Sequence, residues 1–255
     1  MTYCVGLLLM DGLVLLSDTR TNAGPDNIAS YTKMHVCESR DRVITLMSAG
    51  NLAITQAVVA RVMEGAGAPE DFDAPETLYT VTSMFDAARL VGDAIREVYI
   101  RDGQSLAAQS YAFDASVILA GQIKDRRMRM FNIYSAGNFI EAGPDTPYFQ
   151  IGETKYGKPI LDRVAKYDTP LNDAVKLALI SMDSTLRSNF SVGLPADLMV
   201  VKRDPPLIAT RQRITADDEY FRTISDSWSA ALRQAYRDLP APPWINGGAN
   251  GIAAE

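Results

Sequence analysis

The first eighteen residues constrain the fold most strongly, because they contain two apolar runs separated by a turn. Tyr3–Leu9 is rich in β-forming residues, Gly12 lies in the turn, and Leu13–Leu16 is the second run. This pattern predicts a β-hairpin. A three-residue loop with Gly12 in the left-handed conformation would place Asp18 on the same face as Thr2. A two-residue loop would turn Asp18 to the other face; we expect the former.

Thr2 is a candidate nucleophile because it follows the initiator methionine. Removal of Met1 would leave a threonine with a hydroxyl and a free α-amine, a nucleophile and a base in one residue. An α-amine titrates near ~8, so at neutral pH part of it can accept the hydroxyl proton. Because many chains begin with Met-Thr, this signal needs support from the rest of the sequence.

Lys33 supplies such support, because it lies in a run of β-branched and aromatic residues downstream of Asp18. Burying an ammonium group is costly unless the group is paired, and Asp18 is an available partner. An ion pair beside the terminal amine would favour the neutral form of that amine and stabilise the deprotonated oxygen of Thr2. The alternative is an edge-strand lysine that prevents aggregation.

Gly50 follows a strand predicted over 42–48 and precedes a helix that includes Leu52. At such a junction a backbone N–H can approach a reacting carbonyl closely. The alternative is an ordinary glycine in a tight turn.

The rest of the chain alternates between predicted helices and strands, with a loop over 65–75. We predict further helices over 76–101, 171–186 and 217–239, and further strands over 115–123, 128–134, 138–142, 148–151, 197–201 and 207–215. Residues 1–239 are predicted to form one domain that ends in the helix 217–239. Residues 240–255 are rich in Pro, Gly and Ala and are predicted to be a flexible tail.

Taken together, these features resemble the proteasome-type β subunits of the N-terminal-nucleophile hydrolase superfamily. The shared features are an N-terminal threonine, Asp18-x-Arg20, a lysine on the next strand and Met47-Ser48-Ala49-Gly50. Three segments are similar to the bacterial Anbu branch, the ancestral β-subunit homologues: 20–24, 33–36 and 151–161. The resemblance covers roughly residues 2 to 215 and, for Anbu, the whole chain.

The resemblance implies an α+β fold, a four-layer αββα sandwich of two antiparallel sheets, and a threonine endopeptidase. It implies that the Gly50 N–H binds the oxyanion and that Ser188 and Ser191 orient the amine. Asn22 would pair with the substrate backbone. The specificity pocket would be lined by Tyr31, His35, Ser48 and Leu52. The substrate would be a peptide or unfolded protein, and the chain would form a homo-oligomer, as a ring or an open helix. Neither a metal nor an organic cofactor is expected, and whether the chain has an unfoldase partner is left open by the sequence.

Two positions depart from the family pattern. Ser188 stands where an aspartate is expected, and Glu153 or Thr154 stands where a serine would support the amine. Two alternatives therefore stay open: a weakly active or non-catalytic assembly protein that keeps the fold, and a small-molecule amidase of the same superfamily.

Composition excludes several other classes. A net charge of −6 and a pI near 4.9 argue against a nucleic-acid or anionic-membrane surface. One histidine cannot form a two-histidine zinc motif, and two cysteines indicate no disulfide framework. The run 152–158 matches a phosphate loop, but Pro159 follows it and indicates a helix start instead. No signal peptide or membrane span is apparent, so we expect a cytoplasmic protein.

Overall fold

The structure is a computed structural model that describes residues 1–22, 28–65 and 76–246. Most of the predicted loop 65–75 and the end of the predicted tail lie outside these residues. The start of that tail forms a short helix, α6 (Pro243–Asn246).

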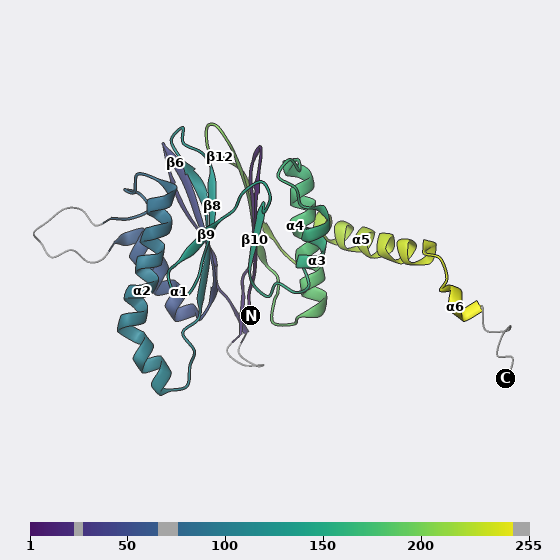
Figure 1. The fold of residues 1–255 in the computed structure, drawn as a ribbon, viewed down its shortest axis with the longest axis horizontal. Coiled ribbons are helices and arrows are strands. Elements are labelled where there is room, and N and C mark those ends of the chain that lie inside the picture. The colour runs from purple at the N-terminus through teal and green to yellow at the C-terminus, as the bar shows by residue number, and fades with distance from the viewer. Residues whose placement is uncertain (23–27, 66–75, 247–255) are drawn as a thin grey trace, which may run out of the picture.

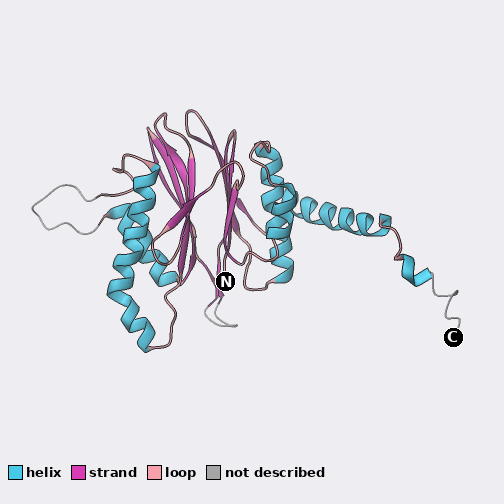
Figure 2. Cartoon of the chain, in the orientation of Figure 1, coloured by secondary structure: helices cyan, strands magenta, loops and turns pink. Residues whose placement is uncertain are grey.

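Two antiparallel sheets pack face to face, and helices cover both outer faces (Figures 1 and 2). One sheet has the strand order β10-β1-β2-β11-β12, and the other has the order β5-β6-β7-β8-β9. The strands of the first sheet are β1 (Tyr3–Leu9), β2 (Gly12–Asp18), β10 (Tyr148–Gly152), β11 (Ala196–Lys202) and β12 (Leu207–Ile214). Those of the second are β5 (Met34–Ser39), β6 (Arg42–Gly50), β7 (Ala115–Ile123), β8 (Arg129–Ile133) and β9 (Phe139–Glu141).

The helices form the two outer layers. Helices α1 (Leu52–Glu64) and α2 (Met84–Ala108) cover the second sheet, and α3 (Lys158–Val164) and α4 (Leu171–Ser188) cover the first. The hydrophobic core is accordingly divided into three parts: one between the sheets and one under each helical layer. This arrangement confirms the predicted α+β four-layer sandwich.

The N-terminal hairpin is present, but its predicted register is wrong. Leu9 pairs with Gly12, so the loop has two residues, and the alternation of β2 groups Asp18 with Leu16, which packs under α4. The physical reason is that β11 also pairs with the start of β2. Gly12 has a φ of +155°, and a Cβ at this position would lie 2.1 Å from the carbonyl oxygen of Val201, so both the backbone conformation and this close approach require glycine.

Helix α2 begins at Met84, eight residues after the predicted start. Ser83 ends the preceding turns and caps the helix, because its Oγ accepts a hydrogen bond of 3.0 Å from the backbone N–H of Asp86. Leu78 and Val81 are buried as a helical stripe would require, but both lie before the helix begins. The Arg42 guanidinium donates hydrogen bonds to the carbonyl oxygens of both.

The last long helix, α5 (Glu219–Asp238), agrees with the prediction over 217–239 and projects away from the sandwich (Figure 1). The Asp218 side chain caps it by accepting a 2.8 Å hydrogen bond from the N–H of Phe221. Phe221 is the one buried residue among those described in this helix. Its first half contacts α4, where Ser225 Oγ donates to Asp183 at 2.7 Å.

Candidate active site

Thr2 lies directly before β1 and is buried, with 8% of its surface exposed. Its carbonyl oxygen accepts a 2.7 Å hydrogen bond from the backbone N–H of Glu153, which follows β10. Thr2 and Met1 line a cavity of about 450 Å³. The other side of this cavity is formed by the end of β6 and the start of α1, so the cavity lies where the two sheets meet the first helix.

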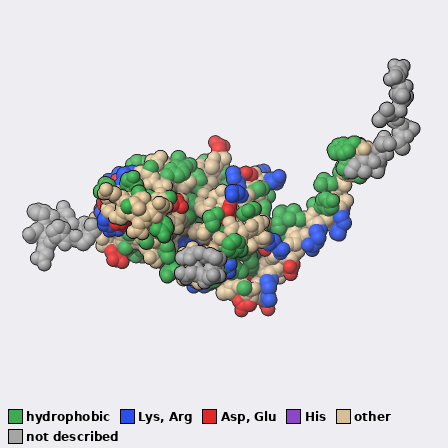
Figure 3. Space-filling view, turned by 90° about the horizontal axis from the view of Figure 1, so that it is seen from below, with side chains coloured by type: hydrophobic (Ala, Val, Ile, Leu, Met, Phe, Trp, Pro, Cys, Tyr) green, Lys and Arg blue, Asp and Glu red, His purple; other side chains and the backbone are tan. Residues whose placement is uncertain are grey.

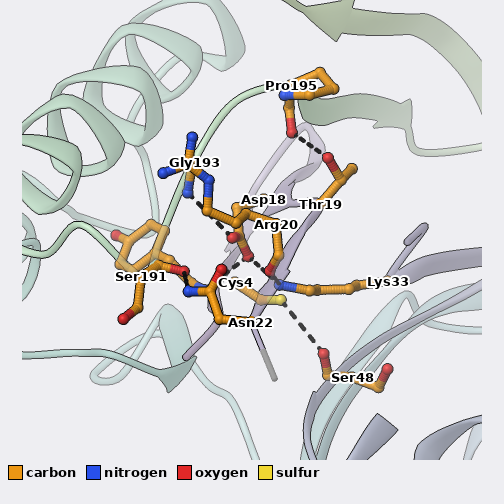
Figure 4. Close-up of polar contacts among 11 residues, drawn as sticks. Cys4, Asp18, Thr19, Arg20, Asn22, Lys33, Ser48, Ser191, Gly193 and Pro195 are labelled. Atoms are coloured by element: carbon orange, nitrogen blue, oxygen red, sulfur yellow. Dashed lines mark hydrogen bonds and ion pairs between the residues drawn. The ribbon is translucent and has the colours of Figure 1, made fainter. Parts of the chain in front are cut away.

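Asp18 and Lys33 form a buried ion pair next to this cavity (Figure 4). Lys33 Nζ lies 2.7 Å from Asp18 Oδ1 and 2.6 Å from the carbonyl oxygen of Arg20. Asp18 also accepts hydrogen bonds from the N–H groups of Tyr3, at 3.0 Å, and Gly193, at 3.4 Å. Burial raises the pKa of the Asp18 carboxyl, and the Lys33 ammonium and these two N–H groups oppose that shift.

The ion pair joins the two sheets. Asp18 ends β2 in the first sheet, and Lys33 comes just before β5 in the second. The carbonyl oxygen of Lys33 accepts a 3.1 Å hydrogen bond from the N–H of Ser48 in β6. The hairpin register differs from the predicted one. Asp18 nevertheless reaches Lys33, because Asp18 is the last residue of β2. Lys33 itself lines the cavity that Thr2 lines.

Four of the five predicted substrate-contacting residues line the same cavity as Thr2: Asn22, Tyr31, Ser48 and Leu52. Asn22 belongs to β3 (Arg20–Asn22), which pairs with β4 (Ile28–Ser30) in a small two-stranded sheet that the sequence did not reveal.

His35, the fifth, is not among the residues that line this cavity, and its role in the specificity pocket stays a prediction. His35 pairs with Leu46, whose side chain belongs to the core under α1 and α2, whereas its neighbour Met34 faces the core between the sheets. Side chains alternate along a strand, so His35 lies on the face of β5 that is turned toward α1 and α2. Burial lowers the pKa of its imidazole.

Gly50 ends β6 and lines the cavity, as expected for a residue near the nucleophile. Its φ is +116°, and a Cβ at this position would lie 2.3 Å from the carbonyl oxygen of Asp114. Glycine is therefore required here by both the backbone conformation and the close approach of the loop before β7.

The two predicted serines lie near the end of α4 and have different environments. Ser188 is the last residue of the helix, its side chain is exposed, and it does not line the Thr2 cavity. Ser191 is partly buried. Its N–H donates to Asn189 Oδ1 at 2.9 Å, and its carbonyl oxygen accepts from Asn22 Nδ2 at 3.1 Å (Figure 4). The backbone of Ser191 thus holds the wall of the cavity at Asn22.

Asn189 is the contact residue that sequence reasoning missed. Its Nδ2 donates a 2.9 Å hydrogen bond to Glu153 Oε2, and Glu153 lies across from Thr2. Thr21, Asn51 and Tyr111 also line the cavity and were not predicted. Thr21 and Asn51 are next to predicted site residues in the sequence, and this proximity was the one signal that could have identified them. For Tyr111 no local pattern marks the position, because it follows α2.

The described residues contain neither a cluster of metal ligands nor a membrane-spanning helix. None of their His, Cys, Asp and Glu side chains gather in groups of three or more that could bind a metal ion. None of their helices combines the length and apolar character that crossing a membrane requires.

An αββα sandwich with a threonine before its first strand and a buried Asp–Lys pair beside that threonine has the architecture of proteasome-type N-terminal-nucleophile hydrolases. Comparison with solved structures agrees. A Gly-1 mutant of Anbu from Hyphomicrobium sp. strain MC1 is 52% identical, with a TM-score of 0.87 over 95% of this chain and 99% of that one. Anbu (ancestral β-subunit) from Yersinia bercovieri is 46% identical, with a TM-score of 0.84 over 94% and 98%.

A third structure, the helical assembly of the Anbu complex from Pseudomonas aeruginosa, is 43% identical, with a TM-score of 0.85 over 95% of this chain and 99% of that one. No protein-family model and no curated protein matches the chain. Identity and coverage at this level show that the chain belongs to the Anbu family of proteasome-type β-subunit homologues.

Proposed function

We propose that this chain is a threonine-type peptidase whose nucleophile is Thr2 after removal of Met1. The observation that carries the proposal is the ion pair of Lys33 with Asp18, which is buried at the cavity that Thr2 lines. A buried ammonium is costly to keep unless it is paired. An ammonium group beside a residue that can carry both a hydroxyl and an amine can tune the protonation of both groups.

In the proposed reaction, the Thr2 amine accepts the hydroxyl proton, directly or through a water, and Oγ attacks the carbonyl carbon of a peptide bond. The positive charge of Lys33 disfavours protonation of the amine and stabilises the developing negative charge on Oγ. The Gly50 N–H would stabilise the oxyanion, a contribution of ~3 kcal/mol for one such donor. The amine then returns the proton to the leaving nitrogen, and a water hydrolyses the resulting ester.

The cavity supports a peptide substrate. Asn22 offers an amide that can pair with an extended backbone, and Tyr31 and Leu52 contribute apolar side chains to the lining. Both Cys4 and Cys37 are free and buried, which is consistent with a reducing compartment such as the cytoplasm.

We also propose that the chain forms a homo-oligomer, as the Pseudomonas aeruginosa relative does in its helical assembly. The support in this chain is the projecting helix α5. Its second half exposes large apolar side chains, of which Leu232 is 50% and Tyr236 77% exposed, and Figure 3 shows apolar surface along this arm. Sedimentation velocity should show an assembly that Leu232→Ser with Tyr236→Ser weakens. A monomeric wild-type chain would refute this proposal.

The second candidate is an assembly protein that keeps the fold without catalysis. It is favoured by Ser188, which is exposed and offers no carboxylate. A hydrolysis assay with fluorogenic peptides and an unfolded protein decides between the two. We expect turnover by the wild type, loss in Thr2→Ala and retention of part of the activity in Thr2→Ser, which keeps a hydroxyl. Activity that survives in Thr2→Ala would assign hydrolysis to another residue or to a contaminant, and no activity in any variant would favour the assembly protein.

A further inference from the structure

Glu153 is a buried carboxylate next to Thr2. It follows β10, whose last residue, Gly152, pairs with Tyr3, so Thr2 and Glu153 are the next residues along two paired strands. The Glu153 N–H donates to the Thr2 carbonyl oxygen at 2.7 Å, which fixes the two backbones against each other. The whole residue is only 4% exposed.

Among the described residues, the Glu153 carboxylate has neutral hydrogen-bond donors but no cationic partner. Asn189 Nδ2 donates to Oε2 at 2.9 Å, and the backbone N–H of Lys155 donates to Oε1 at 3.3 Å. Within the described ranges, no salt bridge to Glu153 falls inside 4.0 Å. An ionised carboxylate can accept about four hydrogen bonds, so acceptor capacity remains. A buried charge without a counter-charge is costly.

We infer that Glu153, held by Asn189, is the positioning residue that binds the ammonium form of the Thr2 α-amine once Met1 has been removed. This inference rests on the proposed function only through that removal. Loss of Met1 creates a cation at the residue across the strand pair from an unpaired carboxylate. The carboxylate that the family pattern places at Ser188 is then supplied by Glu153, and Asn189, the residue after Ser188, ties it to the end of α4.

The arrangement places the amine between opposing charges. Lys33, on the cavity side, lowers the pKa of the amine by repulsion, and Glu153 raises it by attraction. The nearby charges of Asp18 and Arg20 are already engaged: Asp18 pairs with Lys33, and Arg20 Nη1 donates to the carbonyl oxygen of Phe190 at 2.9 Å. Glu153 therefore sets how much of the amine is available as a base at neutral pH and holds it in a fixed orientation.

The test measures the Thr2 amine itself, without relying on catalysis. The chain is produced behind a cleavable fusion that leaves Thr2 as the first residue. The rate of reductive methylation of its α-amine is then followed by peptide mass spectrometry between about pH 5 and pH 9. An opposite charge within ~4–6 Å shifts a pKa by one or more units. We therefore expect the midpoint of labelling to fall by about one unit in Glu153→Gln. The matched control Glu38→Gln removes an exposed carboxylate on β5 and should leave the midpoint unchanged.

Two further variants keep the inference falsifiable if Glu153→Gln does not fold. Glu153→Ser restores the serine of the family pattern and should lower the midpoint in the same way. Asn189→Ala removes the donor that holds the Glu153 carboxylate and should move the midpoint in the same direction by less. An unchanged midpoint in a folded Glu153 variant would overturn the inference. If the proposed function fails instead, the wild-type hydroxyl will not react with an electrophile, yet the midpoints will still differ between wild type and variant.

Discussion

Replacing Lys33 with methionine tests the central interaction of the site. The substitution keeps much of the aliphatic stem but leaves Asp18, which is completely buried, with only the N–H groups of Tyr3 and Gly193. The carbonyl oxygen of Arg20 also loses its 2.6 Å donor. The variant must therefore either bury an unpaired carboxylate or protonate it.

Protonation sets the upper limit of the cost. A carboxyl with an ordinary pKa of 3.8 lies about three units below neutral pH, and each unit corresponds to about 1.36 kcal/mol, so the limit is roughly 4 kcal/mol at about pH 7. Breaking a buried pair on one side costs about 3–5 kcal/mol in other proteins. We expect Lys33→Met to lower the free energy of unfolding by about 3 kcal/mol, as measured by urea denaturation.

The sign of the pH dependence provides a second check. In the variant, the Asp18 pKa in the folded state lies above that in the unfolded state, so the folded state binds the extra proton and stability rises as pH falls toward 3.8. The loss relative to wild type should shrink to roughly 2 kcal/mol near pH 5. Asp18→Asn with Lys33→Met removes both charges and should recover about 2 kcal/mol.

Lys202→Met, at an exposed lysine in β11, serves as the control and should change stability by less than about 0.5 kcal/mol. A loss below about 1 kcal/mol in Lys33→Met, or a loss that does not depend on pH, would refute the assignment of a buried ionised pair.

Three further outcomes follow from the structure. Burial lowers the pKa of His35 below 6.5, so the unfolded state binds the imidazole proton more readily and stability falls as pH drops through 6.5. Urea titrations should show that His35→Gln removes this part of the pH dependence. The same pH dependence in His35→Gln and in the wild type would contradict this prediction. Gly50→Ala should lower the free energy of unfolding by about 1–3 kcal/mol because of the φ of +116°. Its control, Gly143→Ala, has no atom within 4 Å of the added Cβ and should be neutral. Equal melting curves for the two variants would contradict this prediction. Ser83→Ala should cost about 1 kcal/mol through loss of the α2 cap, measured by thermal unfolding, and an unchanged melting temperature would show that the cap does not matter.

Features set by local pattern were predictable from the sequence. The strand 115–123 coincides with β7, and Leu171 begins both the predicted helix and α4, because periodicity and flanking turns mark these elements. The ends set by other interactions were not. The start of α2 depends on the Ser83 cap, and the hairpin loop depends on β11, which packs on Gly12 from far along the chain.

The candidate site divides in the same way. The partnership of Asp18 and Lys33 follows from the cost of burying an ammonium, so chemistry predicted it even with the strand register wrong. The contact of Glu153 with Asn189 joins a turn after β10 to the end of α4, and no local pattern encodes that meeting.

The measurement that tests the central claim most directly is the intact mass of the chain purified from cells, before and after treatment with an epoxyketone. This reagent bridges a free terminal amine and the neighbouring hydroxyl. The account predicts a mass that lacks Met1, a gain of one adduct and no gain in Thr2→Ala. A chain that retains Met1, or a trimmed chain that never forms the adduct, would contradict Thr2 as the nucleophile.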